Sequence, residues 1–250
     1  MIHIPDLICY WDFDHLDMFT SKGRCAYTLL EGNGKVDSTD EGVLSNSSVR
    51  IRESQFLYIP RALCAELNIH GKQGAVSVLA WVKRKPKSYS QCEAIAGMWN
   101  ETNKLRQYCL FLNIQLYDSA DQVCGHISGV GGPTPGEKWC VDVSIGQTAV
   151  LYDEWSFVAF TYDGKSIRSY LNGEFDKRDH MNPYSYPEGI FDAGENGSDF
   201  TVGAVHRGGE MGNYFVGDLG GLAIFDRALS AGEISSIHAQ HPLNNRPYIS

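Results

Sequence analysis

The chain has 250 residues, of which 43% are hydrophobic and 20% charged, and its formal net charge is −9. This composition provides enough apolar side chains for a core and argues against a disordered chain. The acidic balance argues against nucleic-acid and anionic-membrane partners, because both are recognised by clustered Lys and Arg. The longest apolar run, residues 75–82, is too short to cross a membrane, so the sequence predicts a soluble protein.

One domain covering residues 1–250 is expected, with its core in about residues 7–240, because no proline-rich, serine-rich or charged linker divides the chain. Residues 1–20 contain four aspartates and no basic stretch, so they are not expected to be a signal peptide. These observations leave open the compartment in which the protein works.

The cysteines are odd in number and include no C-x-x-C pair, which argues against a zinc ribbon and a thioredoxin-type motif. Several lie in apolar segments, so buried free thiols are the favoured interpretation. One or two disulfides are the alternative if the protein is exported. The seven residues are Cys9, Cys25, Cys64, Cys92, Cys109, Cys124 and Cys140.

Short strand patterns separated by Gly, Asn, Asp and Pro dominate the chain, which is typical of a sheet protein. The central ones are apolar on both faces, which predicts covered strands in the middle of a two-layer sandwich. Residues 129–150 and 177–199 lack periodicity and are expected to be long loops, which are often functional. The predicted strand regions are, in order, Leu7 to Phe13, Val49 to Ile59, Val76 to Val82, Ala94 to Trp99, Tyr108 to Ile114, Gln122 to Ser128, Trp155 to Asp176, Phe200 to Val205 and Phe215 to Phe225.

Two turns and one helix have specific local signals. Asp163-Gly164 and Asn172-Gly173 are dipeptides that accept positive φ at both central positions of a type I′ turn, so two hairpins are predicted there. Ser230-Ala-Gly-Glu233 is a capping box that predicts a short C-terminal helix. Leu229 and Ile234 occupy the positions of a hydrophobic staple around the start of that helix.

Three segments share a known pattern: the turns around Tyr170-x-Asn-Gly173, the run Thr201-Val-Gly-Ala204, and Gly217 to Ile234, which contains Leu-Ala-Ile-Phe-Asp-Arg-Ala-Leu-Ser. They resemble the LamG-like (laminin G type) domains of the concanavalin A-like lectin/glucanase superfamily, and Tyr10-Trp-Asp-Phe-Asp14 is similar to the opening strand of that group. The resemblance implies an all-β jelly-roll sandwich of two antiparallel sheets with one short C-terminal helix. Because this fold serves lectins, carbohydrate-binding modules, glycanases and lyases alike, it implies less about function. Such domains are often exported.

The resemblance also implies a structural Ca²⁺ site on the convex side, while no other cofactor is expected. Many relatives carry two acidic residues where this chain has Gly220-Gly221. Strict alternation along a strand would place Asp218 on the same face as Gly220, and Asp12 and Asp14 would supply further oxygen ligands. These three aspartates are therefore the candidate Ca²⁺ ligands, with exposed strand-end carboxylates as the alternative.

The richest polar cluster falls between the central strands. One strand ends in Trp99-Asn100-Glu101, the next begins with Arg106-Gln-Tyr108, and the third ends in His126-Ile-Ser128. If these sets point into one concave face, they line a cleft walled by residues 129–150. The candidate ligand-binding residues are thus Trp99, Asn100, Glu101, Arg106, Tyr108, His126 and Ser128.

Three interpretations of this cluster are left open. A sugar-binding face needs flat aromatic rings and planar hydrogen-bonding groups, and the cluster has both. A lyase acting on a uronate would use Arg106 to neutralise the carboxylate and Tyr108 or His126 to take the proton. A purely structural interpretation pairs Arg106 with Glu101 and makes His126 a hydrogen-bonded sheet residue.

Carbohydrate binding is the expected function. The carboxylate run Glu-x-Asp-x-x-Glu of retaining glucanases is absent from the sequence, and the signatures of alginate-cleaving lyases are not matched. A polysaccharide lyase or glycoside hydrolase that uses the same cleft is the first alternative, and a protein-interaction module is the second. An oligosaccharide or polysaccharide is the expected partner.

Overall fold

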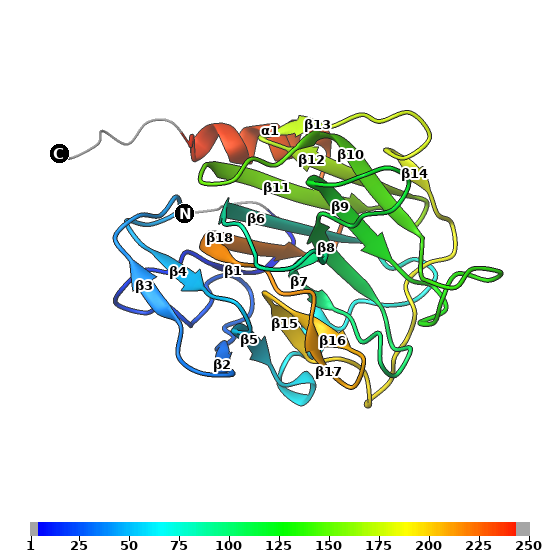
Figure 1. The fold of residues 1–250 in the computed structure, drawn as a ribbon, viewed down its shortest axis with the longest axis horizontal. Coiled ribbons are helices and arrows are strands. Elements are labelled where there is room, and N and C mark those ends of the chain that lie inside the picture. Colours follow the sequence, from blue (N-terminus) through cyan, green and yellow to red (C-terminus); the bar gives the residue numbers. More distant parts are fainter. Residues whose placement is uncertain (1–4, 244–250) are drawn as a thin grey trace.

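The computed structural model describes residues 5–243, and most of its strands form two large antiparallel sheets packed face to face (Figure 1). The predicted all-β sandwich with one C-terminal helix is confirmed. The first sheet has the strand order β13-β12-β11-β6-β18-β4-β3, with β1 beside β18 and β14 beside β12. Its nine strands are β1 (Leu7–Trp11), β3 (Asp37–Thr39), β4 (Ser48–Ile51), β6 (Val76–Arg84), β11 (Trp155–Tyr162), β12 (Ser166–Leu171), β13 (Glu174–Phe175), β14 (Tyr184–Ser185) and β18 (Gly217–Phe225).

The second sheet has the order β10-β9-β8-β7-β15-β5-β2. A separate hairpin, β16 (Val205–Arg207) and β17 (Glu210–Gly212), follows β15 in the chain, and two short 3₁₀ helices, Arg61–Leu63 and Ala65–Leu67, follow β5. The seven strands are β2 (Leu30–Gly32), β5 (Phe56–Ile59), β7 (Glu93–Met98), β8 (Tyr108–Leu112), β9 (Gln122–Ile127), β10 (Val143–Ala149) and β15 (Phe200–Val202).

Strand β6 explains why the central strands are apolar on both faces. Val78, Ala80 and Val82 belong to the large cluster between the two sheets. Leu79 and Trp81 belong to a second cluster on the outer face of the nine-stranded sheet. Because neither face meets water, alternation with polar residues is absent from this strand.

Helix α1 (Ala231–Gln240) covers that outer face. The predicted capping box is confirmed: Ser230 Oγ accepts a hydrogen bond from the Glu233 amide at 3.3 Å, and Glu233 Oε2 accepts one from the Ser230 amide at 2.9 Å. Leu229 and Ile234, the predicted staple pair, are both buried in the same cluster as Phe157. The start of the helix is therefore fixed both by hydrogen bonds and by apolar packing.

The two predicted hairpin turns differ in conformation. Asn172 and Gly173 have φ of 50° and 83°, and Leu171 pairs with Glu174, so this type I′ turn is confirmed. At the other turn only Gly164 has a positive φ, so the type I′ prediction is wrong there. Asp163 Oδ1 instead accepts hydrogen bonds from the amides of residues 165 and 166, and this local capping favours a longer loop.

The connection predicted for residues 129–150 is a loop only as far as residue 142, because β10 forms its last part. Val143 and Ile145 alternate on one face of this strand and are buried, but the following residues 147–149 are exposed. The apolar alternation is therefore too short to be recognised in the sequence. The connection 177–199 is irregular apart from the two-residue strand β14.

Candidate functional site

The outer face of the seven-stranded sheet holds part of the predicted ligand face, but as a packed cluster. The rings of Trp99 and His126 lie 4.6 Å apart between centroids, and Phe111 contacts both at 5.8 Å. The Arg106 guanidinium lies 5.9 Å from the centre of the Trp99 ring. All four side chains are buried. The structure therefore brings Trp99, Arg106 and His126 together beneath a cover of loops, and not in an open ligand face.

Tyr108 points to the opposite face. The register of β8 and β9 pairs Cys109 with His126, so Tyr108, one residue earlier, lies between the two sheets. Its hydroxyl donates to the Leu67 carbonyl oxygen at 2.7 Å. Arg106 precedes the first residue of β8, so the alternation of that strand does not determine the direction of its side chain. The predicted convergence of Arg106, Tyr108 and His126 on one cleft does not occur.

His126 is held as a neutral imidazole. Burial, together with the nearby positive charge of Arg106, lowers its pKa to about 3. Its Nδ1 lies 3.9 Å from the thiol of Cys140, at the end of the loop that covers the cluster. An enclosed neutral ring with these neighbours packs the sheet against its cover, in agreement with the structural interpretation of this residue.

The remaining predicted residues have local partners. Asn100 is buried and its Oδ1 accepts from the Asn103 amide at 2.9 Å, while Ser128 Oγ accepts from the Gly131 amide at 2.9 Å. Glu101 alone keeps part of its side chain in solvent, with 23% exposed. It pairs with Arg207 and not, as the structural interpretation supposed, with Arg106.

An open cavity of about 390 Å³ lies beside this cluster, where the β16–β17 hairpin faces the loops before β5 and β7. Two partly exposed tyrosines and several hydrogen-bonding side chains line it. The lining residues are Glu53, Ser54, Tyr89, Gln91, Arg207, Gly208, Glu210, Met211, Gly212 and Tyr214.

A polar network connects Glu101 to this cavity. Trp99 Nε1 donates to Glu101 Oε1 at 3.3 Å, and Asn213 Nδ2 donates to the same oxygen at 3.1 Å. Arg207 Nη1 donates to Asn213 Oδ1 at 2.7 Å, and the Asn213 amide donates to Gln91 Oε1 at 3.3 Å. Arg207 and Gln91 both line the cavity, so its polar wall is oriented by partners reaching back to the predicted Trp99 and Glu101.

The two tyrosines are held by Lys87. Its ammonium lies 5.1 Å from the centre of the Tyr89 ring and donates to the carbonyl oxygens of Gln91 at 2.7 Å and Tyr214 at 3.1 Å. Burial lowers the pKa of this ammonium, although the carboxylate of Glu93 opposes the effect. One cation thus ties together the segments that carry both rings.

Sequence reasoning missed Tyr89, Arg207 and Tyr214 as site residues. Tyr89 lies in a loop without periodicity, and Arg207 and Tyr214 are brought to it from more than 100 positions later in the chain. The available signal was Gly208-Gly209, a dipeptide that favours a tight hairpin turn, and both glycines have positive φ.

The three candidate Ca²⁺ ligands do not form a common site. Asp218 is buried and accepts two hydrogen bonds from Arg50, at 2.6 and 2.9 Å, so its charge is already neutralised. Asp12 pairs with Lys22, and Asp14 accepts a backbone hydrogen bond. Within residues 5–243, no group of three or more His, Cys, Asp or Glu side chains is placed to hold a metal ion. The three aspartates therefore do not form a Ca²⁺ site. The Ca²⁺ ion expected from the family resemblance stays a prediction without assigned ligands.

Gly220 and Gly221 of β18 have a packing role. The register between β18 and β6 shifts between Leu219 and Gly221, so the alternation assumed from Asp218 to Gly220 is broken by an irregularity. A Cβ on Gly220 would lie 2.9 Å from the Trp155 ring and 3.1 Å from the amide nitrogen of Val43. Only glycine lets residues 43–44 approach the sheet here.

Two antiparallel sheets packed face to face define a jelly-roll β-sandwich. A laminin G-type family model, described as the concanavalin A-like lectin/glucanases superfamily, matches residues 62–235. The match covers more than half of the chain, and the chain therefore belongs to this family. The family predicted from the sequence is confirmed.

Solved structures with the same fold include domain 4 of AbnA, an extracellular GH43 arabinanase from Geobacillus stearothermophilus, in complex with arabinotriose. It is 14% identical, with a TM-score of 0.61, and the alignment covers 93% of this chain and 98% of that domain. The CBM40 of the Ruminococcus gnavus IT-sialidase is 14% identical, with a TM-score of 0.55 and coverages of 76% and 96%.

The binding domain of botulinum neurotoxin serotype G is 15% identical, with a TM-score of 0.62, and the alignment covers 94% of this chain but 51% of that one, so this chain spans about half of its length. At these identities the likeness concerns the fold. A search of curated proteins finds no match. Among the helices of residues 5–243, none has the length and apolar character needed to cross a bilayer.

Proposed function

We propose that the protein binds carbohydrate in the cavity beside the β16–β17 hairpin. The observation that supports this most directly is the combination, in one open cavity, of two aromatic rings with oriented planar polar groups. Tyr89 and Tyr214 offer flat apolar surfaces for the faces of sugar rings. Arg207 and Gln91 offer donors and acceptors for hydroxyl groups.

The network behind the cavity supports the same function. Arg207 and Gln91 are each held through Asn213, which in turn donates to Glu101. Side chains fixed before a ligand arrives lose less conformational entropy on binding. The arrangement therefore favours recognition of a specific pattern of hydroxyl groups. Domain 4 of AbnA, which has this fold, is solved in complex with arabinotriose, and this is consistent with the proposal.

The test is calorimetric titration with a panel of oligosaccharides that includes arabinotriose and a sialylated trisaccharide. Binding is expected for at least one member of the panel. Tyr214→Ala is expected to weaken this binding by about tenfold or more, since stacking of a ligand ring on one aromatic side chain contributes on the order of 1–3 kcal/mol in other proteins. Leu16→Ala, which removes a fully exposed apolar side chain in an N-terminal loop, is the control.

Glu101→Gln tests the contribution of the polar network to binding separately from that of aromatic stacking. The variant keeps the shape of the side chain but removes the charge that faces Arg207, so weaker binding with unchanged folding is expected. Absence of binding across the panel, or full binding by Tyr214→Ala, would contradict the proposal. Release of reducing ends or of ultraviolet-absorbing unsaturated products would instead favour the enzymatic alternative.

A further inference from the structure

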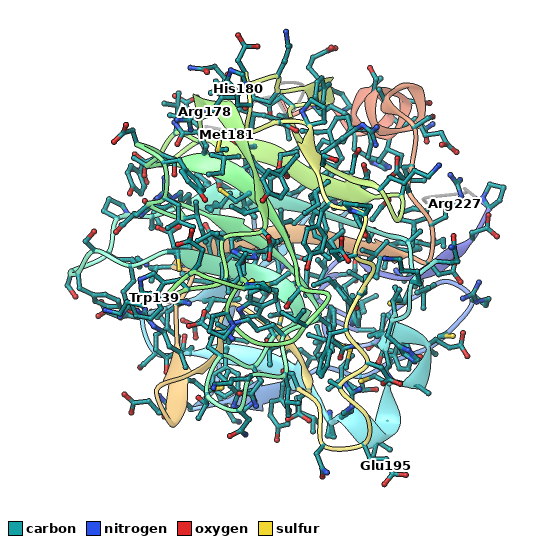
Figure 2. The ribbon with its side chains drawn as sticks, turned by 90° about the vertical axis from the view of Figure 1, so that its right-hand side faces the viewer. Trp139, Arg178, His180, Met181, Glu195 and Arg227 are labelled. Atoms are coloured by element: carbon teal, nitrogen blue, oxygen red, sulfur yellow. The ribbon has the colours of Figure 1, made fainter. Side chains whose placement is uncertain are left out.

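Residues 129–142 cover the other end of the Trp99 cluster through Cys140, and they hold an indole ring in solvent. Trp139 is 55% exposed, whereas Trp11, Trp81 and Trp99 are each 1% exposed or less. It lies at the edge of the molecule away from α1 (Figure 2). The ammonium of Lys138 lies 4.7 Å from the centre of its ring.

Hydrogen bonds fix the backbone of the loop around this residue. The Thr134 amide donates to the Trp139 carbonyl oxygen at 3.1 Å. Thr134 Oγ1 donates to Asp142 Oδ2 at 2.6 Å and accepts from the Val141 amide at 2.9 Å. The free energy falls when a large apolar side chain leaves water. A loop whose hydrogen bonds keep such a side chain exposed is therefore expected to bind a partner there.

A second exposed aromatic residue lies on the neighbouring loop. Tyr117 is 49% exposed, and its φ of 52° is one of four positive values among non-glycine residues 113–118. Arg178 Nη2 donates to the Tyr117 carbonyl oxygen at 2.8 Å and stabilises this conformation. Partial burial, with the charges of Glu137 and Asp142, raises the pKa of its phenol. The adjacent Leu116 packs against the same buried cluster as Cys140 of the Trp139 loop. Strained backbone of this kind is often found in ligand-binding segments.

The exposed rings and the cavity lie on the same side of the seven-stranded sheet. The buried cluster under both includes Val205 of the hairpin at one end and Cys140 of the loop at the other. It extends across β7, β8, β9 and β10, and three inter-strand spacings amount to roughly 15 Å. Contact points at opposite ends of this cluster are too far apart for one sugar, whereas a glycan chain spans them.

We propose that Trp139 is a second contact point for the glycan chain that occupies the cavity, so that the natural ligand is a polysaccharide. This inference rests on the proposed function. The indole face not covered by Lys138 stacks on a sugar ring, while the ammonium lies against the opposite face of the indole. Contact at two points on one chain raises its affinity above that of a short fragment bound in the cavity alone.

The test compares polymer with fragment. Arabinan, xylan, laminarin and polysialic acid, each paired with its own trisaccharide, are titrated into the wild-type protein and into Trp139→Ala. The variant is expected to weaken binding of the recognised polymer by about tenfold or more and to leave the trisaccharide affinity within about twofold. Trp139→Phe, which keeps an aromatic face, is expected to retain most of the polymer affinity, and Leu16→Ala is the matched control.

Quenching of tryptophan fluorescence by iodide provides a second readout, because Trp139 is exposed, whereas Trp155 is partly buried and the other three indoles are buried. Bound polymer is expected to protect the quenchable fraction of the fluorescence, whereas the trisaccharide is expected to leave it unchanged. In Trp139→Ala, most of that quenchable fraction is expected to be absent. Equal polymer affinity in Trp139→Ala, or quenching unchanged by bound polymer, overturns the inference while the proposed function stands. Binding of no polymer and no trisaccharide overturns both. If Trp139→Ala loses binding to a protein but keeps polymer binding, this surface is a protein-docking site and the inference is wrong.

Discussion

On the seven-stranded sheet, the role of a single residue depends on where its strand begins and on how that strand pairs with its neighbour. Tyr108 and His126 look equivalent in the sequence, since both are polar groups in apolar strands. The pairing of Cys109 with His126 sends Tyr108 into the core and His126 to the outer face. A shift of one residue exchanges the two faces of a strand, and the sequence does not specify the register between neighbouring strands.

His126 gives a prediction about pH. Its pKa is lowered from an ordinary value near 6.5 to about 3 by burial and by Arg106, so the folded protein holds it neutral while the unfolded chain protonates it. Stability is therefore expected to fall as the pH drops from about 6.5 toward 3, by up to roughly 5 kcal/mol from this group. The measurement is the free energy of unfolding in urea at pH 7, 5 and 4.

In His126→Gln this contribution is removed, so the loss of stability between pH 7 and pH 4 is expected to be smaller than in the wild type. His180→Gln, which changes an exposed histidine, should follow the wild-type curve. Parallel curves for wild type and His126→Gln would show that the ring does not carry this pH dependence.

Among the elements, helix α1 is the one whose local sequence signals agree most closely with its packing in the folded protein. Its capping box and staple were visible in the sequence, and the structure uses both to seat the helix on the nine-stranded sheet. Strand β10 is the opposite case, because only Val143 and Ile145 mark it. Elements with a complete local signal are predictable, whereas short strands are defined by the neighbour that pairs with them.

Ser230→Ala is expected to lower the free energy of unfolding by about 1 kcal/mol, since the first turn of α1 loses the side-chain acceptor for the Glu233 amide. Chemical denaturation followed by circular dichroism measures the change. The matched control is Ser236→Ala, an exposed serine within the same helix, for which a change within about 0.5 kcal/mol is expected. Equal effects of the two substitutions would contradict a capping role.

At the scale of the whole molecule, the sandwich encloses most of its thiols. All seven cysteines are free, and five of them are buried. Burial raises the pKa of Cys9 and Cys109, which disfavours the reactive thiolate. The predicted free thiols are thus confirmed in the folded chain, and stability comes from the packed sheets without covalent links.

A thiol reagent such as Ellman's reagent is expected to titrate seven groups in denaturant without prior reduction, and at most the two half-buried ones, Cys25 and Cys92, rapidly in the native protein. Melting temperatures with and without a reducing agent should agree. Fewer than seven groups in denaturant would reveal a disulfide and a protein that matures in an oxidising environment.

The sequence by itself determined the family, the two-sheet architecture, the single C-terminal helix and the apolar central strands. Caps, turn dipeptides and side-chain alternation are local signals that a short stretch of chain carries, as the capping box of α1 and the Asn172-Gly173 turn show. Only the tertiary structure decided which groups meet: Trp99, Arg106 and His126 under a cover of loops, Asp218 with Arg50, and Tyr89 with Arg207 and Tyr214 in an open cavity. These contacts join residues from distant parts of the chain through strand register and loop paths, which no local pattern specifies.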